Sequence, residues 1–384
     1  MASSAEKITA IFEKEQHDAK VTKATEVPTS YDSITDAWLT DVICDSTPDA
    51  AVVAHRLDAR DDGSSNRRRI FIDYNEAGQR AGLPTTVFCK AAETLNNRLV
   101  LGISGAAQTE VNFYNLVRPR LGIEAPVNVY SRFDPDSYAS LIMLQDLGGK
   151  VEFCDDRTVI DWDRATSQAT TLARLHSPFY QSPELGSATL PFRTWFKWWR
   201  DMMTASPQFA ESCDIAFGDS EALMPARLFK RRAEIWPATD LSIARHEVLP
   251  HTLIHCDVHL KNWYVTPENV MGLSDWQIIS VGHWSRDFVY TMTTALTIED
   301  RRKWEKDLLR FYLDKMEEFG VPKVSEDEAW KNLRQQLMTA LAFWTITLHP
   351  APGMPDMQPE RTTHEFLRRL YAAIDDHDAL DSFD

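Results

Sequence analysis

The spacing of apolar residues is mainly alternating in the first 145 residues and mainly helical afterwards. Alternation predicts strands at residues 51–57, 69–74 and 85–90, because successive side chains of a strand point to opposite faces of a sheet. Helical spacing then predicts helices at residues 161–176, 192–204, 221–235, 298–318, 326–348 and 361–375. Strands grouped before helices are typical of an α+β fold. We therefore expect a small antiparallel-sheet unit at residues 1–145 and a larger, mainly helical unit at residues 146–384.

Two further segments belong to the first unit. Residues 108–118 have helical spacing, with Glu110 in the first turns and Pro119 closing the segment. Residues 139–144 read as a strand that leads into a glycine-containing hinge. Lys90 lies near the end of the third predicted strand, and residues 78–84 are expected to form a loop.

The composition limits the class of partner. The 384 residues carry a formal net charge of −16, which disfavours nucleic acid, because nucleic-acid affinity comes largely from lysine and arginine contacts to phosphates. A nucleoside triphosphate is not excluded, since one pocket of an acidic protein can be locally positive. The five cysteines are scattered and follow no metal-binding spacing. No apolar run is long enough for a membrane helix, so we expect a cytoplasmic protein without a membrane partner.

The segment from His255 to Asn262, HCDVHLKN, carries most of the chemical information. Residues 263–265 and 270–273 are short apolar runs separated by turn-forming residues. Pairing about a turn centred between Glu268 and Asn269 would place Asn262 opposite Asp275. The oxygens of both side chains would then project from one end of a hairpin, beside Asp257.

Two facing oxygen donors suit Mg²⁺, which takes few protein ligands and completes its shell with water and phosphate oxygens. We therefore expect Asn262 and Asp275 to hold Mg²⁺ and Asp257 to accept the proton of an attacking hydroxyl group. Lys90 is a candidate cation for the phosphates, and Glu110 is its natural partner. The turn at residues 61–66, with Gly63, Ser64 and Ser65, offers backbone amides and hydroxyls to an anion.

Two other interpretations remain open. His255, Asp257 and His259 would share one face of a strand and could form the metal cluster of a hydrolase. The chain could also be a catalytically silent nucleotide-binding module.

The motif H-x-D-x-x-x-x-N at His255, Asp257 and Asn262, followed by Asp275, resembles the aminoglycoside phosphotransferase and choline kinase superfamily. Lys90 in VFCK, Glu110 in TEVNFYNLVRPRL and the segment LIMLQDLGG resemble further elements of that superfamily. The sequences DWQ at residues 275–277 and RDFVY at residues 286–290 are similar to its ecdysteroid-kinase-like branch.

This resemblance implies a protein-kinase-like, two-lobed fold that transfers the γ-phosphoryl group of ATP or GTP to a hydroxylated small molecule. Asp257 would be the base, Asn262 and Asp275 the Mg²⁺ ligands, and Lys90, anchored by Glu110, the contact to the α- and β-phosphates. The turn with Gly63, Ser64 and Ser65 would replace a glycine-rich phosphate loop. The backbone of the linker, represented by Gln145 and Leu147, would receive the purine. The acceptor and the oligomeric state stay undefined.

Other residues have supporting roles in this interpretation. We expect His255 to be structural and Arg286 and Asp287 to brace the catalytic loop. The aromatic run at residues 192–199 is interpreted as core, with an acceptor pocket as the alternative. The same alternative applies to Phe343, Trp344 and the loop at residues 349–353.

Overall fold

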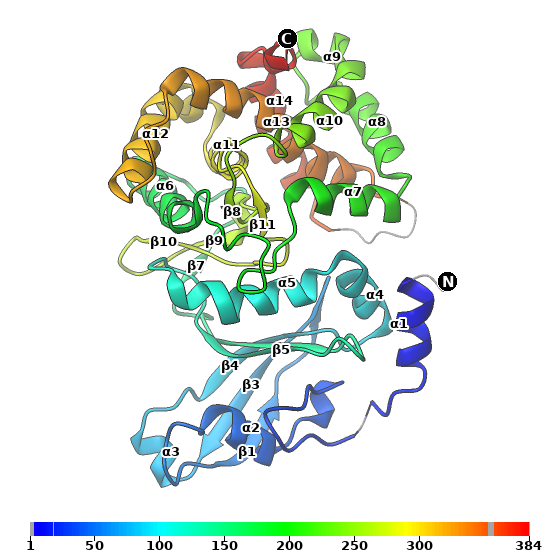
Figure 1. The fold of residues 1–384 in the computed structure, drawn as a ribbon, viewed down its shortest axis with the longest axis vertical. Helices are drawn as coiled ribbons and strands as arrows, with labels where there is room; N and C mark the ends of the chain where they lie inside the picture. The colour runs from blue at the N-terminus through cyan, green and yellow to red at the C-terminus, as the bar shows by residue number, and fades with distance from the viewer. Residues whose placement is uncertain (1–3, 18, 352–356, 384) are drawn as a thin grey trace. The chain divides into compact units, whose positions relative to one another are not determined.

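The computed structural model describes residues 4–17, 19–351 and 357–383, which form two compact units. The first unit contains the residues up to Arg120 together with Ala125–Gly149, and the second contains Leu121–Glu124 and the residues from Lys150 onward. The first has an antiparallel sheet and the second is mainly helical (Figure 1). The predicted α+β class is confirmed.

The sheet of the first unit has six strands, all paired antiparallel. Along the sheet the order is β1-β3-β4-β6-β5, and β2 pairs with β3. The strand bounds are β1 Val52–Leu57, β2 Asp61–Asp62, β3 Asn66–Tyr74, β4 Thr86–Ala91, β5 Asn128–Phe133 and β6 Ser140–Gln145. The predicted strands are present, whereas β2 and β5 were not predicted.

Alternation along β4 sends neighbouring side chains to opposite faces of the sheet. Cys89 is buried in the core formed with Trp38 of α2 (Asp36–Ile43). Lys90 points to the other face, where it contacts Glu110 of α5 (Ala106–Asn112). The pleat of β4 thus directs Lys90 away from the apolar core.

One prediction for the remaining segments of this unit is wrong. Residues 78–84 were expected to be a loop, but α3 (Glu76–Arg80) covers part of them, because the Asn75 side chain caps it by accepting the N–H of Gly78. The other helices are α1 (Ser4–Phe12), α4 (Leu95–Ser104), a π-helical turn (Phe113–Val117) and 3₁₀ turns at Tyr31–Ser33 and Arg118–Arg120.

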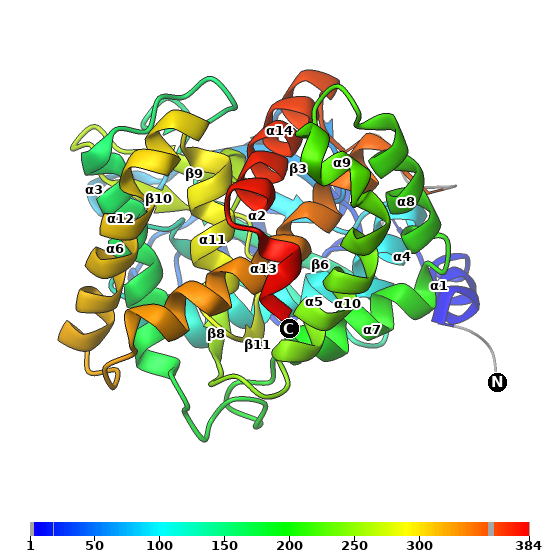
Figure 2. The ribbon, with the colours of Figure 1, turned by 90° about the horizontal axis from the view of Figure 1, so that it is seen from above.

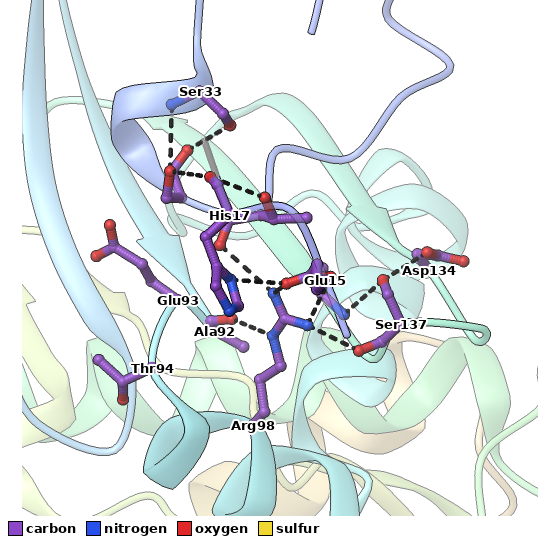
Figure 3. A network of polar contacts seen from close by, with 12 residues as sticks. Glu15, His17, Ser33, Ala92, Glu93, Thr94, Arg98, Asp134 and Ser137 are labelled. Atoms are coloured by element: carbon purple, nitrogen blue, oxygen red, sulfur yellow. Dashed lines mark hydrogen bonds and ion pairs between the residues drawn. The ribbon is translucent and has the colours of Figure 1, made fainter. Parts of the chain in front are cut away.

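The segment between α1 and α2 is tied to the sheet unit through Arg98 of α4, which is fully buried (Figure 3). Its guanidinium donates to both carboxylate oxygens of Glu15, at 2.9 and 2.6 Å, and to the carbonyls of Ala92 and Ser137. His17 contacts the same carboxylate at 3.0 Å. Two hydrogen bonds from one guanidinium to one carboxylate are strong and fix the relative orientation of the two side chains. The segment between α1 and α2 is therefore an integral part of this unit.

The second unit packs its helices around α11, whose residues are all buried (Figure 2). Its neighbours are α6, α12, α13 and α14. The helix bounds are α6 Trp162–His176, α7 Trp195–Ala205, α8 Phe209–Asp219, α9 Ala226–Lys230, α10 Ile235–Arg245, α11 Ser285–Ala295, α12 Ile298–Glu318, α13 Glu326–Leu348 and α14 Glu360–Asp376. Short strands complete it: β7 Glu152–Phe153, β8 Thr252–Ile254, β9 Trp263–Val265, β10 Met271–Leu273 and β11 Ser280–Gly282.

The helix predicted at residues 221–235 is wrong. Pro225 begins the short helix α9, and a new helix, α10, starts at Ile235. Pro237 lies in the first turn of α10, where its missing N–H has no helical partner to lose. Pro237 is therefore compatible with the start of α10, close to the position where the predicted helix was expected to end.

All five cysteines are buried and free of disulfides. Within residues 4–17, 19–351 and 357–383, no helix combines the length and apolar character needed to span a bilayer.

Candidate active site

The loop after β8 is held by two side chains from the first turn of α11. The carboxylate of Asp287 accepts the N–H groups of His255, at 2.6 Å, and Cys256, at 2.9 Å. Arg286 donates to the carbonyl of Cys256 at 2.7 Å. Cys256 has a φ of 71°, a backbone conformation that costs energy for a residue with a side chain. The predicted brace by Arg286 and Asp287 is confirmed, and it holds the chain in this strained turn.

Asp287 is itself fully buried, and His176 of α6 supports it. The two side chains approach to 3.3 Å, and the other ring nitrogen of His176 contacts the Tyr312 hydroxyl at 2.7 Å. Burial alone would raise the pKa of Asp287, but the hydrogen bond with His176 and the charge of Arg286 lower it below its usual value. The brace therefore carries a negative charge at neutral pH.

His255 has a structural role, as predicted. Its Nδ1 accepts the N–H of Asp257 at 3.1 Å, so its proton lies on Nε2, which donates to the carbonyl of Ser274 at 3.0 Å. Burial lowers the pKa of His255 and keeps the ring neutral. The ring also meets Trp276 edge to face, with centroids 4.5 Å apart. His255 thus joins the loop of Asp257 to the segment that carries Asp275.

Asp257 is partly exposed, with 30% of its side chain accessible. The amide nitrogen of Asn262 donates to its carbonyl at 2.7 Å and to Oδ2 at 3.3 Å. The Tyr290 hydroxyl donates to Oδ1 at 3.3 Å, and Nε2 of His259 lies 3.5 Å from Oδ2. Burial by itself raises the pKa of Asp257, but His259 and then His255 lower it, with a net shift below the usual value. Asp257 is an accessible, ionised carboxylate.

The predicted register of the following hairpin is wrong by one residue. Trp263 pairs with Leu273, and the next residue pair along the hairpin is Asn262 with Ser274. The carbonyl of Asn262 accepts both the N–H of Ser274, at 2.8 Å, and its hydroxyl, at 2.9 Å. Asp275 is therefore one residue beyond the partner of Asn262.

The shift arises in the turn. Thr266 closes the loop with Val270 through an N–H to carbonyl bond of 2.9 Å, and Asn269 between them has a φ of 60°. Asparagine tolerates this left-handed conformation, and an odd loop of this type is typical of hairpins that contain a tight turn followed by a left-handed residue. The prediction assumed an even loop.

Asp275 also has a left-handed backbone, with a φ of 63°. It directly follows Ser274, which is bonded to Asn262, and it belongs to the same segment as Trp276, which contacts His255. The structure thus brings Asp257 and Asn262 into direct contact and ties the chain on either side of Asp275 to them.

The metal cluster of a hydrolase is contradicted. Cys256 interrupts the alternation that would place His255, Asp257 and His259 on one face, and both ring nitrogens of His255 are already bonded within the loop. The part of the chain that the structure describes contains no group of three His, Cys, Asp or Glu side chains arranged to hold a metal ion.

In the first unit, Lys90 and Glu110 form a buried ion pair. The ammonium of Lys90 lies 2.7 Å from the carboxylate of Glu110, with the two side chains 10% and 3% exposed. β4 supplies the lysine and α5 the glutamate, as predicted. A lysine held in this way keeps its charge and one orientation.

The turn at Gly63–Ser65 is fixed by side chains rather than by a run of glycines. The amide nitrogen of Asn97 donates to the carbonyls of Gly63 and Ser64, at 2.8 Å each. Because carbonyl and N–H point in opposite directions across a trans peptide, the N–H groups of Ser64 and Ser65 point away from Asn97. Asn66 holds the base of the turn by accepting the N–H groups after β4.

The linker after β6 has a defined turn. Asp146 accepts from Arg69 at 3.0 Å and from the N–H of Gly148 at 2.9 Å. A Cβ atom on Gly148 would lie 2.6 Å from the Arg69 guanidinium, so a larger residue would displace that side chain. The N–H of Gln145 is already bonded to the carbonyl of Val127. Leu147 is therefore the better of the two predicted residues for a backbone contact to a purine.

The aromatic run of α7 lies in the core, as the favoured interpretation had it. Trp195 and Trp198 are buried and stack with centroids 5.0 Å apart, and the Arg286 guanidinium lies 4.3 Å from the ring centre of Trp195. Trp344 is buried as well. Of the candidate acceptor loop at residues 349–353, residues 352 and 353 lie outside the described residues.

Sequence reasoning missed three contributors. Asn97 carries no motif, and its role depends on the long-range approach of α4 to the turn. Tyr290 stands in the RDFVY segment, three residues after Asp287, so helical spacing could have placed it on the same face of α11. Its partner Trp344 is distant in sequence and gave no such signal.

A model of the phosphotransferase enzyme family matches residues 164–326, a segment that contains Asp257, Asn262 and Asp275. The match covers less than half of the chain, and it supports the predicted superfamily of aminoglycoside phosphotransferases and choline kinases. The narrower ecdysteroid-kinase-like branch stays a prediction. The match also supports the class of phosphotransferases for this chain.

Comparison with other proteins adds little beyond the family. No curated protein sequence matches the chain. An ethanolamine kinase from Plasmodium vivax is 10% identical, with 97% of this chain and 94% of that chain covered and a TM-score of 0.49. A putative aminoglycoside phosphotransferase from Ralstonia eutropha is 14% identical, with 88% and 96% covered and a TM-score of 0.49. Both TM-scores are below 0.5, so neither similarity carries an inference about activity.

Proposed function

We propose that the chain is a Mg²⁺-dependent kinase that transfers the γ-phosphoryl group of a nucleoside triphosphate to a hydroxyl group of a small molecule. The observation that carries this proposal is the contact between Asn262 and Asp257 in a loop braced by Asp287. It holds an ionised carboxylate beside an amide oxygen, which are the two groups that a base and a hard metal ligand require.

Asp257 acts as the base in this proposal. Its pKa is below the usual value, so it is ionised at neutral pH and ready to accept a proton. The hydroxyl oxygen of the acceptor forms a bond to the γ-phosphorus, the nucleoside diphosphate leaves, and the hydroxyl proton passes to Asp257. Positioning and charge stabilisation provide most of the rate enhancement in such reactions.

The donor set fits Mg²⁺. The amide nitrogen of Asn262 is used by Asp257, which leaves the amide oxygen as its ligand atom. Asp275, next to Ser274 on the adjoining strand end, supplies a carboxylate. Oxygen ligands from one amide and one carboxylate are what Mg²⁺ accepts when water and phosphate complete its shell. When bound, the ion would neutralise charge on the phosphate oxygens.

Lys90 contacts the α- and β-phosphates in this proposal, and Glu110 fixes its direction. The N–H groups of Ser64 and Ser65, directed away from Asn97, support a phosphate-binding role for the turn. The backbone of Leu147 would receive the purine of ATP or GTP. The acceptor is a hydroxylated metabolite, and the apolar composition of the helical unit favours a fairly apolar one.

The proposal is tested by a nucleotide-consumption screen against hydroxylated metabolites, run with ATP and with GTP, and with or without Mg²⁺. We expect Mg²⁺-dependent formation of nucleoside diphosphate together with an acceptor whose mass has increased by one phosphoryl group. Tight nucleotide binding without transfer to any acceptor or to water would instead identify a silent member of the fold.

Asp275→Ala tests the metal site separately. Removing this carboxylate should abolish the Mg²⁺-dependent part of nucleotide binding and leave the weak metal-independent part. Thermal-shift titrations of nucleotide with and without Mg²⁺ measure both parts. Equal Mg²⁺ dependence in the variant and the parent chain would exclude Asp275 as a ligand.

A further inference from the structure

Tyr290 and Trp344 form a chain of hydrogen bonds that ends on Asp257. The indole nitrogen of Trp344 lies 2.8 Å from the Tyr290 hydroxyl, which lies 3.3 Å from Oδ1 of Asp257. Tyr290 comes from α11 and Trp344 from α13, two helices packed side by side (Figure 2). Both side chains are buried, at 0% and 2% exposure.

The chain of hydrogen bonds has only one possible direction. An indole N–H can donate but cannot accept, so the oxygen of Tyr290 is the acceptor for Trp344. Its own proton must then point elsewhere, and the carboxylate of Asp257 is the acceptor within reach. Burial, followed by the negative charge of Asp257, raises the pKa of Tyr290, which keeps the hydroxyl protonated.

The other oxygen of Asp257 has different neighbours. Oδ2 lies 3.3 Å from the amide nitrogen of Asn262 and 3.5 Å from Nε2 of His259. Tyr290 therefore approaches from α11 against Oδ1, whereas the loop contacts Oδ2. A carboxylate that is contacted from two sides is restricted to one value of its terminal torsion angle, which otherwise has a broad distribution.

We infer that Tyr290 and Trp344 are positioning residues that orient the carboxylate of Asp257 for proton transfer. This inference rests on the proposed function, in which Asp257 is the base. Tyr290 is the group that acts on Asp257, and Trp344 acts through Tyr290. A purely structural role for the pair would stabilise the helices without a selective effect on kcat.

The test follows phosphate release from Mg²⁺·ATP or Mg²⁺·GTP with water as the acceptor, so that it needs no identified metabolite. Tyr290→Phe should lower kcat by about tenfold, the value of one hydrogen bond to a charged group, and leave the KM for nucleotide unchanged. A fall in kcat at constant KM is expected for the loss of a contact that acts on the base rather than on nucleotide binding.

Trp344→Phe should lower kcat by about threefold, because Tyr290 keeps its own hydroxyl. In the double variant the second change should add no further loss in kcat, since both residues act through one contact. Tyr371→Phe is the matched control: its hydroxyl is also buried and bonded, to Ser220 at 3.0 Å, in a part of α14 without a contact to Asp257. This control should retain the parent kcat and KM.

Thermal unfolding of each variant confirms that it is folded. A fall in kcat in a folded variant then reports loss of the contact between Tyr290 and Asp257.

An unchanged kcat in Tyr290→Phe, matching Tyr371→Phe, would overturn the inference while leaving Asp257 as the base. Should Tyr290→Phe fail to fold, Trp344→Phe decides: a fall in kcat with unchanged KM supports the inference, and an unchanged kcat overturns it. Failure of the proposed function is recognised differently, by full phosphate release in Asp257→Asn.

Discussion

The two units hold their proposed functional residues in different ways. In the second unit, the buried carboxylate of Asp287 binds two backbone N–H groups and thereby shapes the loop that carries Asp257. In the first unit, Lys90 and Glu110 neutralise each other directly across a strand and a helix. The first arrangement fixes the path of the backbone, and the second fixes one side chain.

Because of this difference, removing the acidic residue should have different consequences in the two units. Loss of Asp287 leaves backbone donors without their partner inside a core, which affects folding and the base together. Loss of Glu110 removes one charge of a buried ion pair, which affects the direction of Lys90 and, to a smaller extent, the stability of the first unit. The predictions below test this separation.

The largest effect is expected from Asp287→Asn. The amide keeps the shape but has one oxygen to accept two N–H groups, and it loses the charge. We expect the free energy of unfolding to fall by about 3 kcal/mol. Tryptophan fluorescence during urea unfolding measures this, because every tryptophan except Trp38 lies in the second unit. A change below about 0.5 kcal/mol, the range of ordinary surface substitutions, would remove Asp287 as the brace.

Glu110→Gln should give a smaller loss of stability, about 2 kcal/mol, because a buried ion pair loses one of its two charges. The functional effect should appear in nucleotide binding: the KM for nucleotide should rise by roughly tenfold with a lesser effect on kcat. Steady-state kinetics at several nucleotide concentrations separate the two. A selective fall in kcat with unchanged KM would assign Glu110 to the chemical step and break the comparison.

The pH dependence of the free energy of unfolding should reflect the buried histidines of the second unit. Burial lowers the pKa of His246 to about 3, and burial also lowers the pKa values of His255 and His283. Unfolded histidines bind protons below a pKa of about 6.5, whereas these folded ones do not. The contribution of these histidines to the free energy of unfolding is therefore fully present above pH 6.5 and decreases as the pH falls from there toward 3.

His246→Gln tests this directly. In the parent chain His246 accepts the N–H of His283 at 3.0 Å and contacts Gln336 at 2.7 Å. The variant should lose less stability between pH 6.5 and pH 4.5 than the parent does, as measured by urea unfolding at each pH. The half-exposed His364 provides the control, His364→Gln. Parallel curves for parent and His246→Gln would contradict a neutral His246.

The smallest effect is expected from Glu76→Gln, which breaks the exposed ion pair with Arg80, where the side chains are 90% and 73% exposed. Exposed pairs of this kind contribute about 0.5 kcal/mol or less. Compared with Glu110→Gln, this variant shows how much of the effect depends on burial. Equal losses in the two variants would mean that burial of the Lys90 pair adds nothing.

The fold was predictable where local chemistry marks both ends of an element. Thr297 and Ser325 cap α12 and α13 by accepting backbone N–H groups, and both helices have the predicted bounds. The helix α11 was missed because it is buried on all sides and so has no polar face to give it a period. A local pattern shows which face is buried only when another face is exposed.

Part of the site was predictable for a similar reason. Asp257 and Asn262 are close in sequence, and the short loop brings them into contact. Lys90 and Glu110 were paired correctly because one strand and one helix fix them. The hairpin register failed because it depends on the single left-handed residue Asn269. Contacts made only by tertiary packing, such as Trp344 with Tyr290, leave no mark in the sequence.

The most direct test of the account is the turnover of Asp257→Asn measured beside its affinity for Mg²⁺·nucleotide. The account predicts that phosphoryl transfer falls by at least about a thousandfold, as for loss of a general base, while the Kd for nucleotide stays within about twofold, since an amide of the same shape preserves the loop. Transfer at the parent rate in this variant would contradict the assignment of Asp257 and, with it, the proposed mechanism.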